Sequence, residues 1–415
     1  MTETGLMDRF ASTRSMTMSL VGGMSDADAT IQPMPDASPA KWHLAHTTWF
    51  FETFVLRDYG PGYASFHQDW PFLFNSYYEA EGARLARNRR GMLSRPSLDE
   101  IREYRRHVDQ AILAGSDELA GRAADLIELG IHHEQQHQEL LLTDILNAFA
   151  QNPLKPAFVA APGGDAPTGL QQPLIWNEFD GGVVQVGHEG SGFAFDAETP
   201  AHQVILRPFA LANRCITNRE WEEFIAEGGY RDPRHWLSDG WAWVRENAID
   251  RPLYWGEHGG GGRKSFTLGG EGLLDPDAPV CHISLYEADA YASWAGARLP
   301  TEHEWEWAAR DADTLLGNQL DSGHAVKPLP ATGGGLAQMF GDVWEWTGSA
   351  FRPYPGFRIA EGAVGEYNGK FMSGQFVLKG ASCATPRGHS RASYRNFFYP
   401  HQRWQFCGLR LAKDI

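Results

Sequence analysis

The chain has 415 residues, with 36 lysine and arginine residues against 52 aspartate and glutamate residues, which gives a formal net charge of −16. This length suggests two or three domains, and an apolar fraction of 42% with 12% aromatic residues is typical of globular proteins. The acidic balance argues against broad binding of nucleic acid or an anionic membrane, and no apolar run is long enough to span a bilayer.

Residues 1–150 are predicted to form helices. Ser38 followed by Pro39 predicts the N-cap of a helix that extends to about residue 56, and Ser97 with Glu100 predicts a capping box for a helix that ends near residue 114. Apolar residues at three- and four-residue steps predict a helix over 118–149, and a weaker helix is expected near residues 7–20. Together these elements predict a four-helix bundle.

Residues 151–173 are rich in proline, glycine and alanine and are predicted to form a linker. Beyond it, strand-like runs (183–186, 203–206 and 376–378) and two short helices (218–227 and 285–295) alternate with loops rich in glycine and tryptophan. This pattern predicts an irregular α+β domain over residues 174–415, with a core that depends on aromatic side chains.

A cluster of histidines is the most informative feature of the predicted bundle. His133 and His137 are four residues apart, so both imidazoles project from one helix face and could hold a single metal ion. Residues 133–137 also match the H-E-x-x-H pattern of zincins, in which Glu134 would be the general base. A zincin needs a third downstream ligand and a strand edge for its peptide, and the sequence suggests neither.

In a bundle, a third ligand would come from a facing helix, and the 39–56 segment offers His43 and His46. Three imidazoles leave coordination positions open, as catalysis requires, but they do not discriminate between zinc, iron, copper and nickel.

These segments resemble a known family. Residues 42–52 (WHLAHTTWFFE) and 133–139 (HEQQHQE) are similar to the DinB-type bundle of the ergothioneine-biosynthetic sulfoxide synthases, the EgtB family. Residues 298–310 (RLPTEHEWEWAAR), 341–347 (GDVWEWT), 393–398 (SYRNFF) and 408–411 (GLRL) resemble the formylglycine-generating-enzyme domain that is fused to it. The resemblance implies a multidomain fold, in which a DinB-like four-helix bundle precedes an irregular α+β domain related to C-type lectins.

The resemblance also implies an activity and a cofactor. The family uses non-heme Fe(II) and O2 to join a thiol to the imidazole C2 of N-α-trimethylhistidine (hercynine), and oxidises the sulfur to a sulfoxide. By resemblance, the iron ligands are His46, His133 and His137, and His43 and His132 are neighbours of the ligands or packing residues. Glu134 is then expected to be dispensable for iron binding. Since the four cysteines show no CxxC spacing and residues 1–23 lack a signal-peptide core, a cytoplasmic location is expected.

The remaining site residues are also carried over from the family. Gln136 and Asn396 match positions that bind hercynine, and Arg87 and Arg90 match arginines that bind the carboxylate of the thiol substrate. The proton donor is expected to be Tyr77 or Tyr78, because one branch carries a double tyrosine in its bundle. Another branch has a tyrosine where this chain has Val364, and Tyr367 is the next candidate.

Phe398 stands where the branch that uses γ-glutamylcysteine is expected to carry an acidic residue, so free cysteine is the predicted thiol.

Several alternatives stay open at this point. Sister enzymes of the same architecture make selenoneine or 5-histidylcysteine sulfoxide, and a DinB-like zinc thiol transferase or hydrolase would use the same bundle. A copper-dependent formylglycine-generating enzyme needs two cysteines a few residues apart, whereas Cys383 and Cys407 are separated by 24 positions. A pure binding module is disfavoured by the histidines. The sequence predicts no particular oligomeric state.

Overall fold

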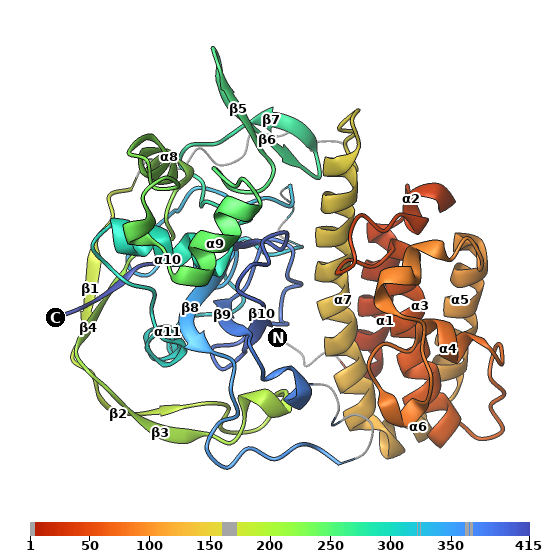
Figure 1. Cartoon of the computed structure of the whole chain (residues 1–415). Coiled ribbons are helices and arrows are strands. Elements are labelled where there is room, and N and C mark those ends of the chain that lie inside the picture. The colour runs from red at the N-terminus through yellow and green to blue at the C-terminus, as the bar shows by residue number, and fades with distance from the viewer. Residues whose placement is uncertain (1–4, 160–171, 322, 324, 362–364, 366–367) are drawn as a thin grey trace. The chain divides into compact units, whose positions relative to one another are not determined.

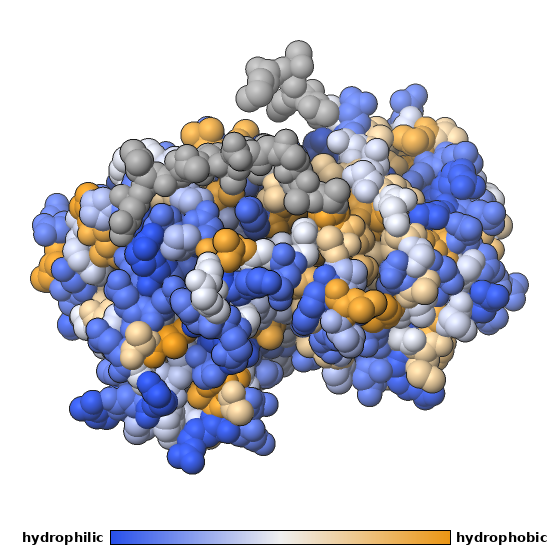
Figure 2. Space-filling model, turned by 90° about the horizontal axis from the view of Figure 1, so that it is seen from above, coloured by the Kyte–Doolittle hydropathy of each residue, from blue (hydrophilic) through white to orange (hydrophobic). Residues whose placement is uncertain are grey.

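The computed structural model describes residues 5–159, 172–321, 323, 325–361, 365 and 368–415. The chain divides into two compact units, with the main division between Gln151 and Asn152 (Figure 1). Of the predicted linker, residues 160–171 lie outside the described part. Hydrophilic side chains cover much of the face seen in Figure 2, and hydrophobic residues form small separate groups. Among the described helices, none is both long and apolar enough to cross a membrane.

The first unit is a four-helix bundle, as predicted. Its principal helices are α1 (Leu6–Leu20), α3 (Ala40–Phe51), α5 (Leu98–Ala114) and α7 (Ala124–Gln151). Helix α7 packs against α1 and α3, and α3 also packs against α5 (Figure 1). All 12 residues of α3 are buried, so this helix is the centre of the bundle. The shorter helices are α2 (Asp26–Thr30), α4 (Trp70–Phe74), α6 (Ser116–Arg122), the 3₁₀-helices η2 (Glu79–Glu81) and η3 (Arg87–Met92), and a π-helix, η1 (Glu52–Arg57), which continues α3.

Two of the local predictions for this unit are wrong and one is confirmed. The capping box of Ser97 and Glu100 is present at the start of α5. Ser38 does not cap α3, because its hydroxyl accepts a hydrogen bond from Arg90 and Pro39 is the N-cap residue. The single helix predicted over 118–149 is two helices, α6 and α7, since the backbone leaves the helical region at Ala123.

The second unit is an irregular α+β fold, as predicted. Its sheets are small: antiparallel β1-β4-β12, mixed β10-β9-β8-β11 with β11 parallel to β8, the β2-β3 ladder and antiparallel β5-β6-β7. The strands are β1 (Trp176–Phe179), β2 (Gly182–Val186), β3 (His202–Leu206), β4 (Phe209–Ala212), β5 (Trp255–Gly259), β6 (Gly262–Thr267), β7 (Gly270–Leu273), β8 (Trp344–Ala350), β9 (Phe376–Gly380), β10 (Asn396–Phe398), β11 (Cys407–Gly408) and β12 (Ala412–Asp414). The longer helices are α8 (Asn218–Ala226), α9 (Ser238–Glu246), α10 (Leu285–Trp294) and α11 (Glu302–Ala309), of which α9 and α11 were not predicted.

The core of the second unit combines large aromatic side chains with buried ion pairs. Trp305, Trp344 and Trp346 are almost completely buried. The carboxylate of Glu345 accepts hydrogen bonds from Arg410 and from the indole N–H of Trp305. Each of these charges has an opposite charge beside it, as a buried ion requires. The prediction of an aromatic core is therefore confirmed.

Candidate metal centre

Three histidines converge where α3 packs against α7. His46 comes from α3, and His133 and His137 come from successive turns of α7. Their ring centroids are 4.7–5.0 Å apart, and one nitrogen of each lies within 4.8 Å of the others. Gly130, one turn before His133, permits this close approach of the helices, because a Cβ atom there would lie 2.4 Å from the ring of Phe51. The three side chains can therefore bind one metal ion.

His46 is held in a fixed orientation. Its Nδ1–H donates a 2.6 Å hydrogen bond to the carbonyl of Phe74, and its ring is stacked between Trp42 and Trp49, with centroid distances of 4.5 and 5.6 Å. Because Nδ1 carries the proton, Nε2 offers its lone pair. This nitrogen is buried and has no hydrogen-bond partner among the described residues. A metal ion would satisfy it.

The three imidazoles are neutral at physiological pH. Burial lowers the pKa of His133 to about 3, and burial together with the neighbouring histidines lowers the pKa values of His46 and His137 well below the usual range. A neutral imidazole is the form that binds a metal. This donor set suits iron, zinc, copper or nickel.

Glu134, the residue that a zincin would use as general base, lies on a different face of α7. Its carboxylate accepts hydrogen bonds from Thr17 and Arg14 on α1, at 2.5 and 2.8 Å, and from Arg105 on α5. Burial opposes its ionisation, but the two guanidinium groups outweigh burial and lower the pKa of Glu134 to about 2. It is a fixed anion that joins three helices, not a base beside the histidines.

A second hydrogen-bonded series reaches His137 from the other side. Nδ1 of His137 lies 2.8 Å from Nδ1 of His43, and Nε2 of His43 lies 3.0 Å from the carboxylate of Asp144. The same carboxylate oxygen accepts the backbone N–H of Ser38 at 2.8 Å. Asp144 was not predicted from the sequence, although its position seven residues after His137 places both on one face of α7.

Arg90 and Arg87 differ in their surroundings. Arg90 is 2% exposed, and its guanidinium lies 3.4 Å from the centroid of the Trp42 ring and donates to the hydroxyls of Ser38 and Ser76. Burial and the nearby charge of Arg87 lower the pKa of Arg90 well below its usual range. No carboxylate contacts this guanidinium among the described residues. Arg87 itself is exposed.

The two predicted tyrosines stack on each other, with centroids 5.0 Å apart. Tyr78 is completely buried and packs against Trp49, which in turn stacks on His46. Tyr77 is partly exposed. Thus one aromatic ring separates Tyr78 from a predicted metal ligand. The alternative positions 364 and 367 lie outside the described residues.

The remaining predicted residues belong to different units. Gln136 precedes His137 on α7 and is partly exposed. Asn396 begins β10 in the second unit, where its side-chain oxygen accepts the backbone N–H of Phe397. Nearby in the chain, Phe398 is partly exposed and its ring lies 6.1 Å from that of Trp404.

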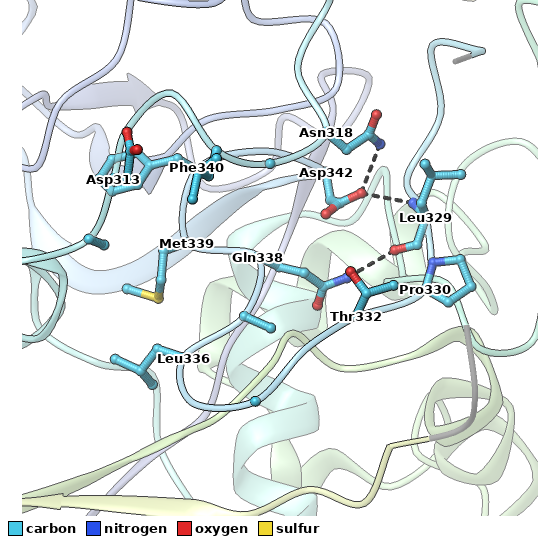
Figure 3. A pocket seen from close by; sticks show the side chains of 15 residues that line it. Asp313, Asn318, Leu329, Pro330, Thr332, Leu336, Gln338, Met339, Phe340 and Asp342 are labelled. Carbon is cyan, nitrogen blue, oxygen red and sulfur yellow. Dashed lines mark hydrogen bonds between the residues drawn. The ribbon is translucent and has the colours of Figure 1, made fainter. Parts of the chain in front are cut away.

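The second unit also contains a cavity of about 560 Å³, lined by residues between 312 and 342 (Figure 3). Its buried carboxylate, Asp342, accepts hydrogen bonds from the side chain of Asn318 and the backbone N–H of Leu329, both at 2.8 Å. Burial nevertheless raises the pKa of Asp342 to about 6. These bonds close the 318–342 loop, so Asp342 has a structural role.

The comparisons with known proteins agree with this architecture. Residues 9–141 match the DinB superfamily, and residues 178–415 match the sulfatase-modifying factor enzyme 1-like domain. The hercynine oxygenase of Mycobacterium tuberculosis is 34% identical, over 98% of this chain and 97% of its own length. The chain belongs to the hercynine oxygenase family.

A second member, the hercynine oxygenase of Mycolicibacterium smegmatis, is also 34% identical, over 99% of both chains. These relatives confirm the predicted family and the prediction of an oxygenase-type enzyme. The formylglycine-generating enzyme of Streptomyces coelicolor is 31% identical over 62% of this chain and 95% of its own length. In this chain the side chains of Cys383 and Cys407 are buried.

Proposed function

We propose that this chain is an Fe(II)- and O2-dependent sulfoxide synthase that joins a thiol to C2 of the imidazole ring of hercynine. In this reaction the S–H and C2–H bonds break, a C–S bond forms, and the two oxygen atoms of O2 end in the sulfoxide and in water. The observation that carries the proposal is the convergence of three neutral imidazoles, two buried and one half-buried, in a chain that resembles hercynine oxygenases along its whole length.

His46, His133 and His137 would hold the iron. Iron(II) bound there would supply the redox chemistry with O2 and a Lewis-acid position for the sulfur. The Nε2 atom of His46, which has no hydrogen-bond partner among the described residues, and the low pKa values of the three rings support this assignment.

The other residues would bind and orient the substrates. Arg90 is the preferred partner of the thiol substrate's carboxylate, because it is a buried cation without a carboxylate contact in the described chain. Arg87 would assist from the surface. Gln136 and Asn396 would hydrogen-bond hercynine. Tyr77 or Tyr78 would donate the proton that oxygen chemistry needs.

The thiol in this proposal is cysteine. A γ-glutamyl donor adds a second carboxylate and moves the ammonium group. Phe398 offers no partner to that ammonium group, and an unpaired buried charge costs several kcal/mol. In a competition assay with both thiols at equal concentration, cysteine should be preferred. A tenfold preference for γ-glutamylcysteine, equivalent to about 1.4 kcal/mol, would contradict this choice.

The main test is anaerobic reconstitution with Fe(II), followed by addition of O2, hercynine and a panel of donors that contains cysteine, γ-glutamylcysteine and a selenosugar. Mass spectrometry should find a sulfoxide one oxygen heavier than the coupled thioether. Reconstitution with Zn(II) should give no product. Product with Zn(II), or coupling to histidine in place of hercynine, would favour the zinc thiol transferase or the histidylcysteine enzyme. We further propose domain boundaries at 1–150 and 174–415.

A further inference from the structure

We propose that His43 and Asp144 act as a positioning pair, which fixes the protonation pattern of His137 and strengthens it as a ligand. This inference rests on the proposed metal centre. Both side chains are buried, with exposed fractions of 3% for His43 and 6% for Asp144. Neither residue is one of the three proposed metal ligands.

The hydrogen-bond pattern follows from what each group can do. A carboxylate only accepts hydrogen bonds, so Nε2 of His43 carries the hydrogen and donates it to Asp144 across 3.0 Å. The other ring nitrogen of His43, Nδ1, then presents a lone pair. It lies 2.8 Å from Nδ1 of His137, which therefore donates.

One consequence concerns the metal-binding atom. When Nδ1 of His137 carries the hydrogen, its Nε2 carries the lone pair and becomes the ligand atom. The opposite pattern would place a hydrogen on Nε2 and block coordination. His46 is fixed in the same way by the carbonyl of Phe74, so two ligands present Nε2 through hydrogen bonds at Nδ1.

A second consequence concerns the strength of the ligand. The negative charge of Asp144 acts on His137 through His43 and makes the imidazole a better electron donor. The carboxylate is itself fixed by the backbone N–H of Ser38 at the start of α3. Since His43 lies on α3 and Asp144 and His137 on α7, the pair also sets the spacing of the two helices that carry the ligands.

The experiment uses the full chain and measures affinity for Co(II), and for Fe(II) without oxygen, by competition with a chromophoric chelator. His43→Phe keeps a ring without nitrogen atoms and should weaken both metals by about 10–100-fold. The matched control is His132→Phe, because His132 is a buried histidine of α7 whose Nε2 lies near Arg9. It should stay within twofold of the unsubstituted protein.

Two further variants separate positioning from a general loss of packing. His43→Asn places an oxygen near the former Nδ1 and should recover most of the metal affinity. Asp144→Asn keeps the shape but removes the charge, so the Fe(III)/Fe(II) potential should become more positive while the melting temperature of the metal-free protein changes little. The same positive shift is expected for His43→Phe.

The outcomes are distinguishable. If His43→Phe bound metal as tightly as His132→Phe and kept the same potential, the positioning role would be overturned while the metal centre stood. An unchanged potential in Asp144→Asn would remove Asp144 from the pair. If the unsubstituted protein bound neither metal, the proposed function would fail together with this inference.

Discussion

Neighbouring residues of helix α7 lie on two different faces, and these two faces make different kinds of contact. His133 and His137 face α3, where their neutral rings converge with His46. Glu134 and Gln138 face α1 instead. There Glu134 is an anion paired with two arginines, and Gln138 donates hydrogen bonds to the backbone carbonyl of Thr13 and the hydroxyl of Thr17. Adjacent residues on an α-helix point about 100° apart, which separates the two sets.

The difference shows how a short motif can mislead. The letters H-E-x-x-H fit a zincin, but the histidines and the glutamate of this helix serve separate functions. On the face toward α3, two neutral imidazoles converge with that of His46. On the face toward α1, the carboxylate of Glu134 is paired with Arg14 and Arg105, which is typical of a structural network.

Removal of one of the three converging histidines should have the largest effect, which is on metal binding. Substitution of His46, His133 or His137 by alanine should lower Fe(II) affinity by more than about hundredfold and abolish turnover, because two imidazoles remain to hold the ion. Metal content after anaerobic loading and gel filtration checks this. The matched control is His107→Ala on α5, an exposed position. Stoichiometric iron in all three variants would refute the assignment.

Removal of the Glu134 charge, on the face of α7 toward α1, should lower the free energy of unfolding. Glu134→Gln leaves Arg105 buried without its paired carboxylate, a loss that typically costs about 3–5 kcal/mol, whereas Arg14 keeps its ion pair with Asp109. Chemical denaturation of the metal-free protein measures it. Glu128→Gln on the same helix breaks only the partly exposed pair with Arg9 and should cost about 0–1 kcal/mol.

Metal content per folded Glu134→Gln molecule should stay at the level of the unsubstituted protein, in agreement with the sequence-based expectation. If the variant kept its stability and its iron but lost all activity, Glu134 would act as a base and the zincin interpretation would return.

The sequence predicted the bundle and the helices that carry the three histidines, because periodicity and H-x-x-x-H spacing are local features. It missed the partners of Glu134, since Arg14 and Arg105 are 120 and 29 positions away and nothing local links them. It placed the start of α3 one residue too early, because the Ser38 hydroxyl bonds to a distant arginine. Long-range polar contacts of this kind have no periodic signal.

The phenol groups of Tyr77 and Tyr78 should affect the rate of sulfoxide formation more than they affect binding. Tyr77→Phe or Tyr78→Phe should leave iron and hercynine binding nearly intact but slow sulfoxide formation by about hundredfold, or divert the thiol to simple oxidation, because phenylalanine keeps the shape without the proton donor. Single-turnover rates and product ratios check this. Tyr59→Phe, whose ring packs near Arg122, is the matched control. Unchanged rates and ratios in both variants would move the role to Tyr367.

The two faces of α7 should also differ in how they make the stability of the metal-free protein depend on pH. An unfolded histidine binds a proton near pH 6.5, but His133 in the folded protein does so only near pH 3. The unfolded state therefore holds more protons in this window, and stability falls as the pH decreases from about 6.5. For Glu134 the corresponding window runs from about pH 4.5 to about pH 2.

Variants separate these two windows. His133→Phe should make the decrease in unfolding free energy between pH 6.5 and 4.5 less steep, because His46 and His137 still contribute to it and Glu134 is mostly ionised in both states. Glu134→Gln should leave that range nearly unchanged and make the decrease below pH 4.5 less steep, although His133 still contributes down to about pH 3. Urea denaturation at half-unit pH steps measures both slopes. Bound metal would hold the histidines unprotonated, so saturating Zn(II) should oppose the decrease in unfolding free energy as long as it stays bound. The decrease between pH 6.5 and 4.5 should therefore depend on metal, whereas the part due to Glu134 should not. Parallel pH curves for the two variants would show that the faces do not titrate separately.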